Sequence, residues 1–268
     1  MQIIIAAISA AAYCWRVIDL HCHVLPGIDD GPASIEGSVA LARAAAAAGI
    51  ETLVATPHVS VRYHNDAATI APLVEQVNDA LALDGVAVRV LAGAEVAMTR
   101  VAELPPGELS LLGLGGGSWV LLEPPFGSVA TGLDSVVGEL QQQGHHVLLA
   151  HPERCQAFHR DPAIVSHLVS RGVRTSVTAD SLVGRFGSTV RRFALAMLEQ
   201  EIVHNVTSDA HDEINRPPGI AAQLQQAGYG AMSEWLAVEV PRAILADQPL
   251  PARPELPAKR PRRWRLRR

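Results

Sequence analysis

Short apolar runs alternate along the chain with longer segments of helical character. Segment 35–48 illustrates the second kind: it is rich in alanine, Ser34 can cap its beginning, and Gly49 ends it. The apolar runs predict strands at 18–23, 50–56, 86–92, 119–122, 146–150, 173–178 and 202–207. The segments between them predict helices at 35–48, 70–83, 133–143, 163–171 and 190–199.

Most of the predicted strands are continuously apolar, which is typical of parallel strands buried on both faces. Seven strands of this kind that alternate with helices indicate an α/β protein, either a doubly wound sheet or a (β/α) barrel. The chain lacks GxGxxG after its first strand and lacks GxxxxGK[ST]. Doubly wound nucleotide-binding folds therefore lose their usual support.

Polar residues that can bind metals follow six of the seven predicted strands. Each alone is more often a capping or surface group, but the active sites of barrel enzymes are built at the carboxyl ends of the strands. Two of them, His21 and His23, lie two apart, so an extended strand places both imidazoles on one face. The candidate metal ligands are His21, His23, Asp30, His58, Glu95, Glu123, His151, Asp209 and His211.

Nine ligands exceed what one or two ions need, because a catalytic ion takes three or four protein ligands and keeps a position open for water. The set suits three divalent ions with one bridging carboxylate. Neighbouring cations stabilise the attacking and leaving oxygens of an in-line displacement and lower the pKa of a bound water. The ligand set therefore favours hydrolysis of a phosphoester by metal-bound hydroxide.

Two arginines and two missing motifs support this chemistry. Arg154 follows His151 by three residues and Arg216 follows His211 by five, and a guanidinium can bind phosphate bidentately. A cysteine phosphatase loop needs Arg six residues after its Cys, where Ile28 follows Cys22 and Asp161 follows Cys155. Gly-x-Ser-x-Gly is also absent, which argues against an α/β-hydrolase.

Charge is distributed unevenly along the 268 residues. Eight Lys/Arg and one Glu between Arg253 and Arg268 give the end of the chain a net charge of +7. Since the net charge of the whole chain is −5, the remainder carries −12. About half of the residues are apolar, which is enough for a sizeable core. The acidic body agrees with a site crowded with carboxylates that await cations.

The cysteines and the two ends of the chain bear on its compartment and boundaries. Three cysteines without a CxxC motif predict a reducing cytoplasm and no disulfide framework. Residues 1–16 are apolar but too short to span a bilayer. A signal peptide is one interpretation of this segment. We favour an upstream extension, because Val17 can be encoded by GTG, a bacterial start codon. We expect one domain at 17–248 and a disordered, Pro/Arg-rich basic tail at 249–268.

Together, the motifs resemble a known family. The strings DLHCHVLPGIDDGP, ATPH, GAE, LLE, AHPER and SDAH followed by RPP are similar to those of the polymerase and histidinol phosphatase (PHP) superfamily. Within it, DDGP, HPER and RPP resemble the metal-dependent bacterial protein-tyrosine phosphatases of the CpsB/CapC type, over about 17–245. Three features depart from that pattern: residues 1–16, the end of strand six at 177–180, and the basic tail.

The resemblance implies a role for each residue. One ion would be held by His21, His23, Glu95 and Asp209. A second would be held by Glu95, Glu123 and His151, and a third by Asp30, His58 and His211. Arg154 and Arg216 would bind the phosphate, so the implied catalytic residues are Arg154, Arg216, Asp30 and His58.

The resemblance also implies a fold, a metal and a substrate. The fold would be a distorted seven-stranded (β/α) barrel, and the metal manganese, with iron and zinc as alternatives. The substrate would be phosphotyrosine on a protein, notably a bacterial tyrosine kinase that controls capsule or exopolysaccharide synthesis. A phenol with a pKa of about 10 is a good leaving group, which suits metal activation without a strong general acid.

Two other functions stay open at the level of sequence. A related PHP-type phosphoesterase would act on a small metabolite such as histidinol phosphate, and a regulatory binding module would keep the fold without turnover. No specific nucleic-acid partner is expected. The tail combines clustered arginines with Trp264 and Leu266, a pattern that favours weak contact with an anionic membrane surface. The sequence does not specify an oligomeric state.

Overall fold

The computed structural model describes residues 17–255, so the expectations for residues 1–16 and for 256–268 lie outside the described residues. Within 17–255 the strands are β1 (Val17–Cys22), β2 (Ile50–Ala55), β3 (His58–Val59), β4 (Arg89–Ala92), β5 (Glu95–Ala97), β6 (Trp119–Glu123), β7 (His146–Ala150), β8 (Arg174–Thr178) and β9 (Asn205–Thr207). The α-helices are α1 (Ile35–Ala47), α2 (Ala67–Leu83), α3 (Glu108–Leu111), α4 (Leu133–Gln142), α5 (Gln156–Arg160), α6 (Ala163–Ser170), α7 (Ala179–Val183), α8 (Ser188–Glu199), α9 (Ala221–Gln226) and α10 (Val240–Leu245).

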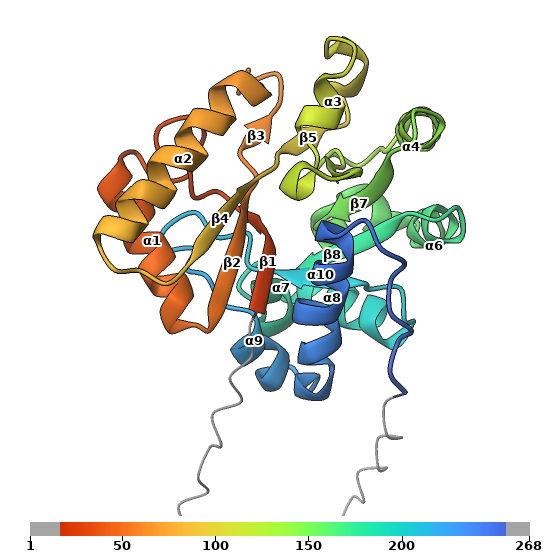
Figure 1. The fold of residues 1–268 in the computed structure, drawn as a ribbon. Helices are drawn as coiled ribbons and strands as arrows, with labels where there is room; N and C mark the ends of the chain where they lie inside the picture. The colour runs from red at the N-terminus through yellow and green to blue at the C-terminus, as the bar shows by residue number, and fades with distance from the viewer. Residues whose placement is uncertain (1–16, 256–268) are drawn as a thin grey trace, which may run out of the picture.

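The described strands form two parallel sheets, one of three strands in the order β1-β2-β4 and one of six in the order β3-β5-β6-β7-β8-β9. Figure 1 shows α1 and α2 outside the smaller sheet, and α4 and α6 outside the larger one. This confirms an α/β fold with parallel strands. The hydrogen bonds within residues 17–255 do not form a single closed seven-stranded sheet.

Two of the predicted strands are each followed by a short strand that was not predicted and that belongs to the other sheet. The predicted strand 50–56 is β2, and β3 begins after Thr56 and Pro57; Pro57 has no N–H to donate to a ladder. The predicted strand 86–92 contains β4, and β5 begins after Gly93 and Ala94. A Cβ on Gly93 would lie 2.8 Å from Cγ1 of Val54, so the close approach of β2 requires glycine there.

The two sheets meet where β1 lies beside β9. Asp209 N–H donates to His21 O and His23 N–H donates to Ala210 O, each at 2.9 Å, and Cys22 and Ala210 form an isolated parallel bridge. The carboxyl ends of β1 and β9 are therefore fixed side by side by the backbone. Residues just beyond these ends, from both termini of the domain, face the same space.

The core is built by the apolar runs themselves. Leu20, Leu53, Leu121 and Leu148 are fully buried members of one continuous cluster. Burial of each such side chain stabilises the fold by about 1.5–3 kcal/mol. No helix within 17–255 has both the length and the apolar character that crossing a bilayer requires.

The end of the described chain lies against the amino-terminal side of the sheets. Trp235 Nε1 donates to Pro251 O at 3.1 Å, and Arg253 Nη1 donates to Val203 O at 2.8 Å, next to the start of β9. Arg253 also lies over the Trp235 ring. Residues up to 255 thus end on the side of the sheets opposite to the carboxyl ends of the strands.

Candidate metal and phosphate site

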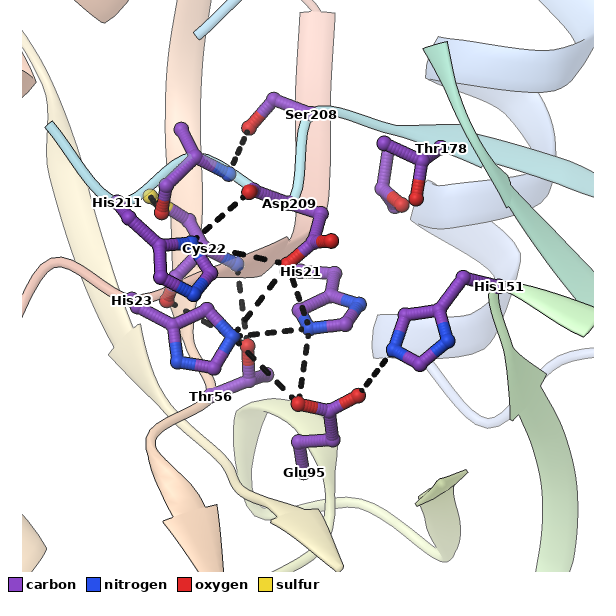
Figure 2. A network of polar contacts seen from close by, with 12 residues as sticks. His21, Cys22, His23, Thr56, Glu95, His151, Thr178, Ser208, Asp209 and His211 are labelled. Atoms are coloured by element: carbon purple, nitrogen blue, oxygen red, sulfur yellow. Dashed lines mark hydrogen bonds and ion pairs between the residues drawn. The ribbon is translucent and has the colours of Figure 1, made fainter. Parts of the chain in front are cut away.

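All nine predicted ligands gather at the carboxyl ends of the strands. Most line a cavity of about 130 Å³, and His21 and His23 lie buried next to it. Figure 2 shows His21, His23, Glu95, His151, Asp209 and His211 pointing toward one another, with the His-x-His pair at the end of β1 and Asp209 and His211 just after β9. The sequence-based expectation that these side chains share one space agrees with this geometry.

The centre of the site is the His-x-His pair with Glu95 of β5. His21 Nε2 lies 3.1 Å from His23 Nε2, and Glu95 Oε2 lies 3.4 and 3.5 Å from these two nitrogens. Asp209 Oδ1 is 3.5 Å from each of the same nitrogens. Four donor atoms therefore face one point, from β1 of the small sheet and from β5 and the end of β9 in the large sheet.

Two further groups of donors adjoin this centre. His58 Nδ1 lies 2.9 Å from Glu95 Oε2, and together with Glu123 they offer ligand atoms within 4.8 Å of one another. Asp30 Oδ1 lies 3.4 Å from Nε2 of both His58 and His211. His23 joins Asp30, His58 and His211 in a second group within 4.8 Å.

These groupings overlap with the three sets that the family resemblance implies, but they are not identical. Glu95 is common to the first two groups, as expected of a bridging carboxylate, with His151 Nε2 2.6 Å from its Oε1. His58, however, lies with Glu95 and Glu123 as well as with Asp30. His151 is close to Glu95, and Asp209 is close to the His-x-His pair, but neither belongs to a group whose ligand atoms all lie within 4.8 Å of one another.

The donor atoms fit bound cations better than they fit one another. Among the described residues, buried Glu95 Oε2, His151 Nδ1 and His211 Nε2 make no hydrogen bond, although Glu95 Oε2 has three imidazole nitrogens within 3.5 Å. Ligand atoms that all bind the same metal ion lie close together in this way without hydrogen bonds between them. Imidazole and carboxylate together suit zinc, iron or manganese.

The electrostatics of the carboxyl groups support the same interpretation. Burial and the neighbouring Glu95 raise the pKa of Glu123 to about 8. Burial also opposes ionisation of Glu95, but His21 and His151 outweigh it and hold its pKa well below the usual range. Two buried carboxyl groups side by side repel each other when both are charged, and a cation between them removes that repulsion.

Arg154 and Arg216 converge on the oxygen of Asp209 that faces away from the His-x-His pair. Arg154 Nη1 and Arg216 Nη2 each donate to Asp209 Oδ2 at 2.6 Å. Burial opposes ionisation of Asp209, but His21, His23 and Arg216 outweigh it and lower its pKa. Both guanidiniums line the cavity and have further N–H donors, so they can bind an anion placed there.

Backbone geometry at two strand ends turns side chains into the cavity. His151 after β7 has φ 30° and Asp209 after β9 has φ 52°, which are left-handed conformations that non-glycine residues seldom adopt. Strain of this kind is concentrated at functional sites because the surrounding structure must maintain it. The Asp209 N–H bond to His21 O is one contact that does so.

Three residues that contact this cluster are not among the predicted ligands and arginines. Asp29 Oδ2 lies 2.7 Å from Nδ1 of His23, and buried Asp19 accepts from the His21 N–H and from Ser208. Burial raises the pKa of Asp19 to about 6. Phe126 lines the cavity and contacts Arg154. A second Asp beside Asp30 and an Asp two residues before His21 were signals for the first two, whereas nothing around Phe126 distinguished it.

Comparison with known proteins identifies relatives of similar length. The chain is 32% identical over 247 residues to the tyrosine-protein phosphatase YwqE of Bacillus subtilis, covering 91% of this chain and 97% of that protein. It is 27% identical to the tyrosine-protein phosphatase CpsB of Streptococcus pneumoniae, covering 87% and 99%.

Solved structures agree with this result. A crystal structure from work on YwqE and CpsB, described as metal-dependent tyrosine phosphatases, superposes with a TM-score of 0.75 at 31% identity and covers 91% of this chain and all of that one. A beta-aspartyl dipeptidase from Fervidobacterium islandicum has a TM-score of 0.54 at 11% identity, covers 85% of this chain and 72% of that one, and shares the fold alone.

The model of the CpsB/CapC family of capsular polysaccharide synthesis proteins matches residues 17–244, nearly the whole described chain. Because the match begins at the first residue of β1 and ends within α10, it includes every strand and all nine predicted ligands. The resemblance deduced from the motifs is confirmed, and the chain belongs to the CpsB/CapC family.

Proposed function

We propose that this protein is a metal-dependent phosphatase that hydrolyses phosphotyrosine on proteins. The observation that carries the proposal is the meeting of nine His and carboxylate side chains with two arginines around one small cavity. The names of YwqE and CpsB support the substrate class, because both are called tyrosine-protein phosphatases and cover most of this chain.

Three divalent ions would occupy the site, with manganese as the first choice and iron or zinc as alternatives. His21, His23, Glu95 and Asp209 would hold one ion, Glu95, Glu123 and His151 a second, and Asp30, His58 and His211 a third. When bound, divalent cations provide Lewis acidity that activates water and neutralises charge on the phosphoryl oxygens.

The protein's own residues would bind and orient the phosphoryl group. Arg154 and Arg216 would each donate to its non-bridging oxygens, and Asp209 Oδ2 would keep both guanidiniums in place through the bonds described above. Asp30 and His58, which are 47% and 17% exposed, are the most accessible of the nine ligands and border the entrance to the cavity. They would therefore meet the substrate first.

The same proposal extends to architecture and setting. We infer that the two sheets are parts of one distorted seven-stranded (β/α) barrel, because β2 with β3 and β4 with β5 replace two of its strands and β1 meets β9. The protein would work in the cytoplasm on a bacterial tyrosine kinase that controls capsule synthesis. Its basic residues beyond 255 would make a weak contact with an anionic membrane surface.

One paired experiment tests the function. The full-length protein, purified without chelator, is analysed for its metal content and assayed with a phosphotyrosyl peptide and with histidinol phosphate. We expect manganese-dependent turnover of the peptide, and an Asp209→Asn variant should lose at least 100-fold in kcat. Preference for histidinol phosphate would indicate a metabolite phosphatase, and a metal-loaded but inert protein would indicate a binding module.

A further inference from the structure

Phe126 occupies an unusual position at the entrance to the cavity. It lies three residues after β6, is 45% exposed, and stacks on the His151 ring with centroids 5.4 Å apart and an angle of 18° between the planes. The guanidinium carbon of Arg154 lies 5.1 Å from the centre of the same ring. An exposed aromatic ring is thus held against one of the proposed ligands and one of the proposed phosphate-binding residues.

The cavity itself is too small for a whole organic phosphate. Pockets that enclose small-molecule ligands have volumes of about 300–1,000 Å³, whereas this one has about 130 Å³. A phosphoryl group fits within it, next to Arg154 and Arg216. The group that carries the phosphate must then lie at the entrance, where Phe126 is exposed.

Other exposed apolar side chains lie on loops that follow strand ends. Val129 in the loop after β6 is 62% exposed, and Ile214 in the loop after β9 is 73% exposed. Val61, after β3, is 65% exposed. Together with Phe126, four of the six large apolar side chains exposed within 17–255 thus follow strand ends, whereas Leu83 and Leu111 end helices α2 and α3. Of the six, Phe126 is the one that lines the cavity, and its exposed ring suits an apolar leaving group better than a hydrophilic one.

We infer that Phe126 is the wall against which the aromatic ring of the substrate packs, so that the entrance selects aryl phosphates over alkyl phosphates. The inference rests on the proposed phosphatase function and adds a residue that determines its specificity. Offset or edge-to-face contact between two aromatic rings is worth about 0.5–1.5 kcal/mol beyond the area that it buries. Phe126 is already held by His151 and Arg154, so little ordering accompanies binding.

Phe186 provides the matched control. Its ring lies 4.7 Å from the same Arg154 guanidinium carbon, yet it is not among the residues that line the cavity. A residue that acts only by positioning Arg154 changes the binding of every phosphoryl ligand equally. A residue that contacts the ring of the ligand changes the binding of aryl ligands alone.

The test measures binding without turnover. Phenylphosphonate and methylphosphonate are titrated calorimetrically into the manganese-loaded full-length protein, its Phe126→Ala variant and its Phe186→Ala variant. We expect the wild-type protein to prefer phenylphosphonate, and Phe126→Ala to reduce that preference about five-fold with little change for methylphosphonate. Phe186→Ala should leave the ratio of the two affinities unchanged. Because Phe126 is half exposed, its replacement should not prevent folding, and a Phe126→Leu variant of similar bulk should lose an intermediate part of the preference.

Three results would overturn the inference. Equal losses for both phosphonates in Phe126→Ala would make Phe126 a positioning residue for Arg154, and an equal loss of preference in Phe186→Ala would remove the special role of the exposed ring. A wild-type protein that binds both phosphonates equally well would refute the aromatic wall and leave the phosphatase proposal standing. A metal-loaded protein that binds neither would contradict both.

Discussion

Asp29 Oδ2 lies 2.7 Å from Nδ1 of His23, and the same oxygen accepts the His58 N–H at 3.2 Å. The Nε2 atom on the other side of the His23 ring faces Glu95 and Asp209. A carboxylate that accepts the free N–H of a metal-ligating histidine fixes the tautomer and the orientation of the ring. Asp29 therefore orients the His23 ring from the side away from the cluster, whereas its neighbour Asp30 lines the cavity.

Replacement of Asp29 tests this support. We expect Asp29→Asn to lower the affinity for manganese by about 10–100-fold, because the bond that orients His23 becomes a neutral one. The affinity is measured by titrating metal into chelator-stripped protein. Asp79→Asn, at an exposed position of α2, is the matched control. Unchanged affinity in Asp29→Asn would show that His23 is held by its packing alone.

The two arginines should act on substrate binding more than on the chemical step. Arg154→Lys and Arg216→Lys each remove a guanidinium whose paired N–H groups suit phosphate, so we expect KM for a phosphotyrosyl peptide to rise about 10–100-fold. Steady-state kinetics separate this from kcat, which should change less. Arg160→Lys, at the exposed end of α5, should behave as wild type. A fall in kcat at constant KM would assign the guanidiniums to the transition state instead.

Gly31 is required by the turn that positions Asp29 and Asp30. A Cβ there would lie 2.3 Å from the backbone oxygen of His23, a contact that backbone movement alone can relieve. We expect Gly31→Ala to lower the free energy of unfolding by about 1–3 kcal/mol and to reduce turnover. Gly127→Ala, where a Cβ meets nothing within 4 Å, should be neutral. Urea denaturation of the two variants makes the comparison, and equal stabilities would refute the steric argument.

His204 gives the fold a defined dependence on pH. Burial, with Arg174 and Arg253 nearby, lowers its pKa to about 3, and its Nδ1 accepts the Thr175 N–H at 3.2 Å. Between pH 6.5 and 3 the unfolded chain binds the proton and the folded chain does not. Stability is therefore complete above pH 6.5 and decreases as the pH falls, by at most about 1.4 kcal/mol per pH unit.

A His204→Asn variant isolates this contribution. Asn retains an acceptor close to the position of Nδ1 but does not titrate, so we expect its unfolding free energy to fall less steeply between pH 6.5 and 4.5 than that of the wild type. Urea unfolding at several pH values gives both curves. Parallel curves would mean that His204 is protonated in the folded protein.

Sequence patterns predicted the elements best where local signals agreed. The helix expected at 35–48 is α1, capped by Ser34 as predicted. The helix expected to begin at 70 instead begins at Ala67, because Asp66 accepts the Thr69 N–H at 2.8 Å and adds a turn. The segment 104–118, between two predicted strands and without a predicted helix, contains α3, whose four residues are too few to show a periodic pattern.

The gathering of the candidate ligands was more predictable than the division of the strands into two sheets. A ligand needs only to follow its strand, so the positions of Glu95 and His151 could be deduced from chain order. The short strands β3 and β5 could not, because their two and three residues show no pattern of their own and are defined by pairing with each other and with β6. Phe126 belongs to a loop, and its contact with Arg154 arises only when that loop folds over the end of β7.

Removal of the metal should affect the entire fold. His21 belongs to β1 of the small sheet and Glu95 to β5 of the large one, and their facing atoms are 3.4 Å apart. An ion bound between them favours the folded state, so chelation should lower Tm by about 5–10 °C. Differential scanning calorimetry with and without chelator measures the shift. An unchanged Tm would show that the junction of the sheets is held by its backbone bonds alone.

The position of the ligands across that junction has a consequence for the life of the protein in the cell. When the metal is scarce, the molecules that lose it would also be those whose two sheets separate most readily, and proteases cleave opened chains first. Scarcity of one nutrient would then reduce both the activity of each copy and the number of copies.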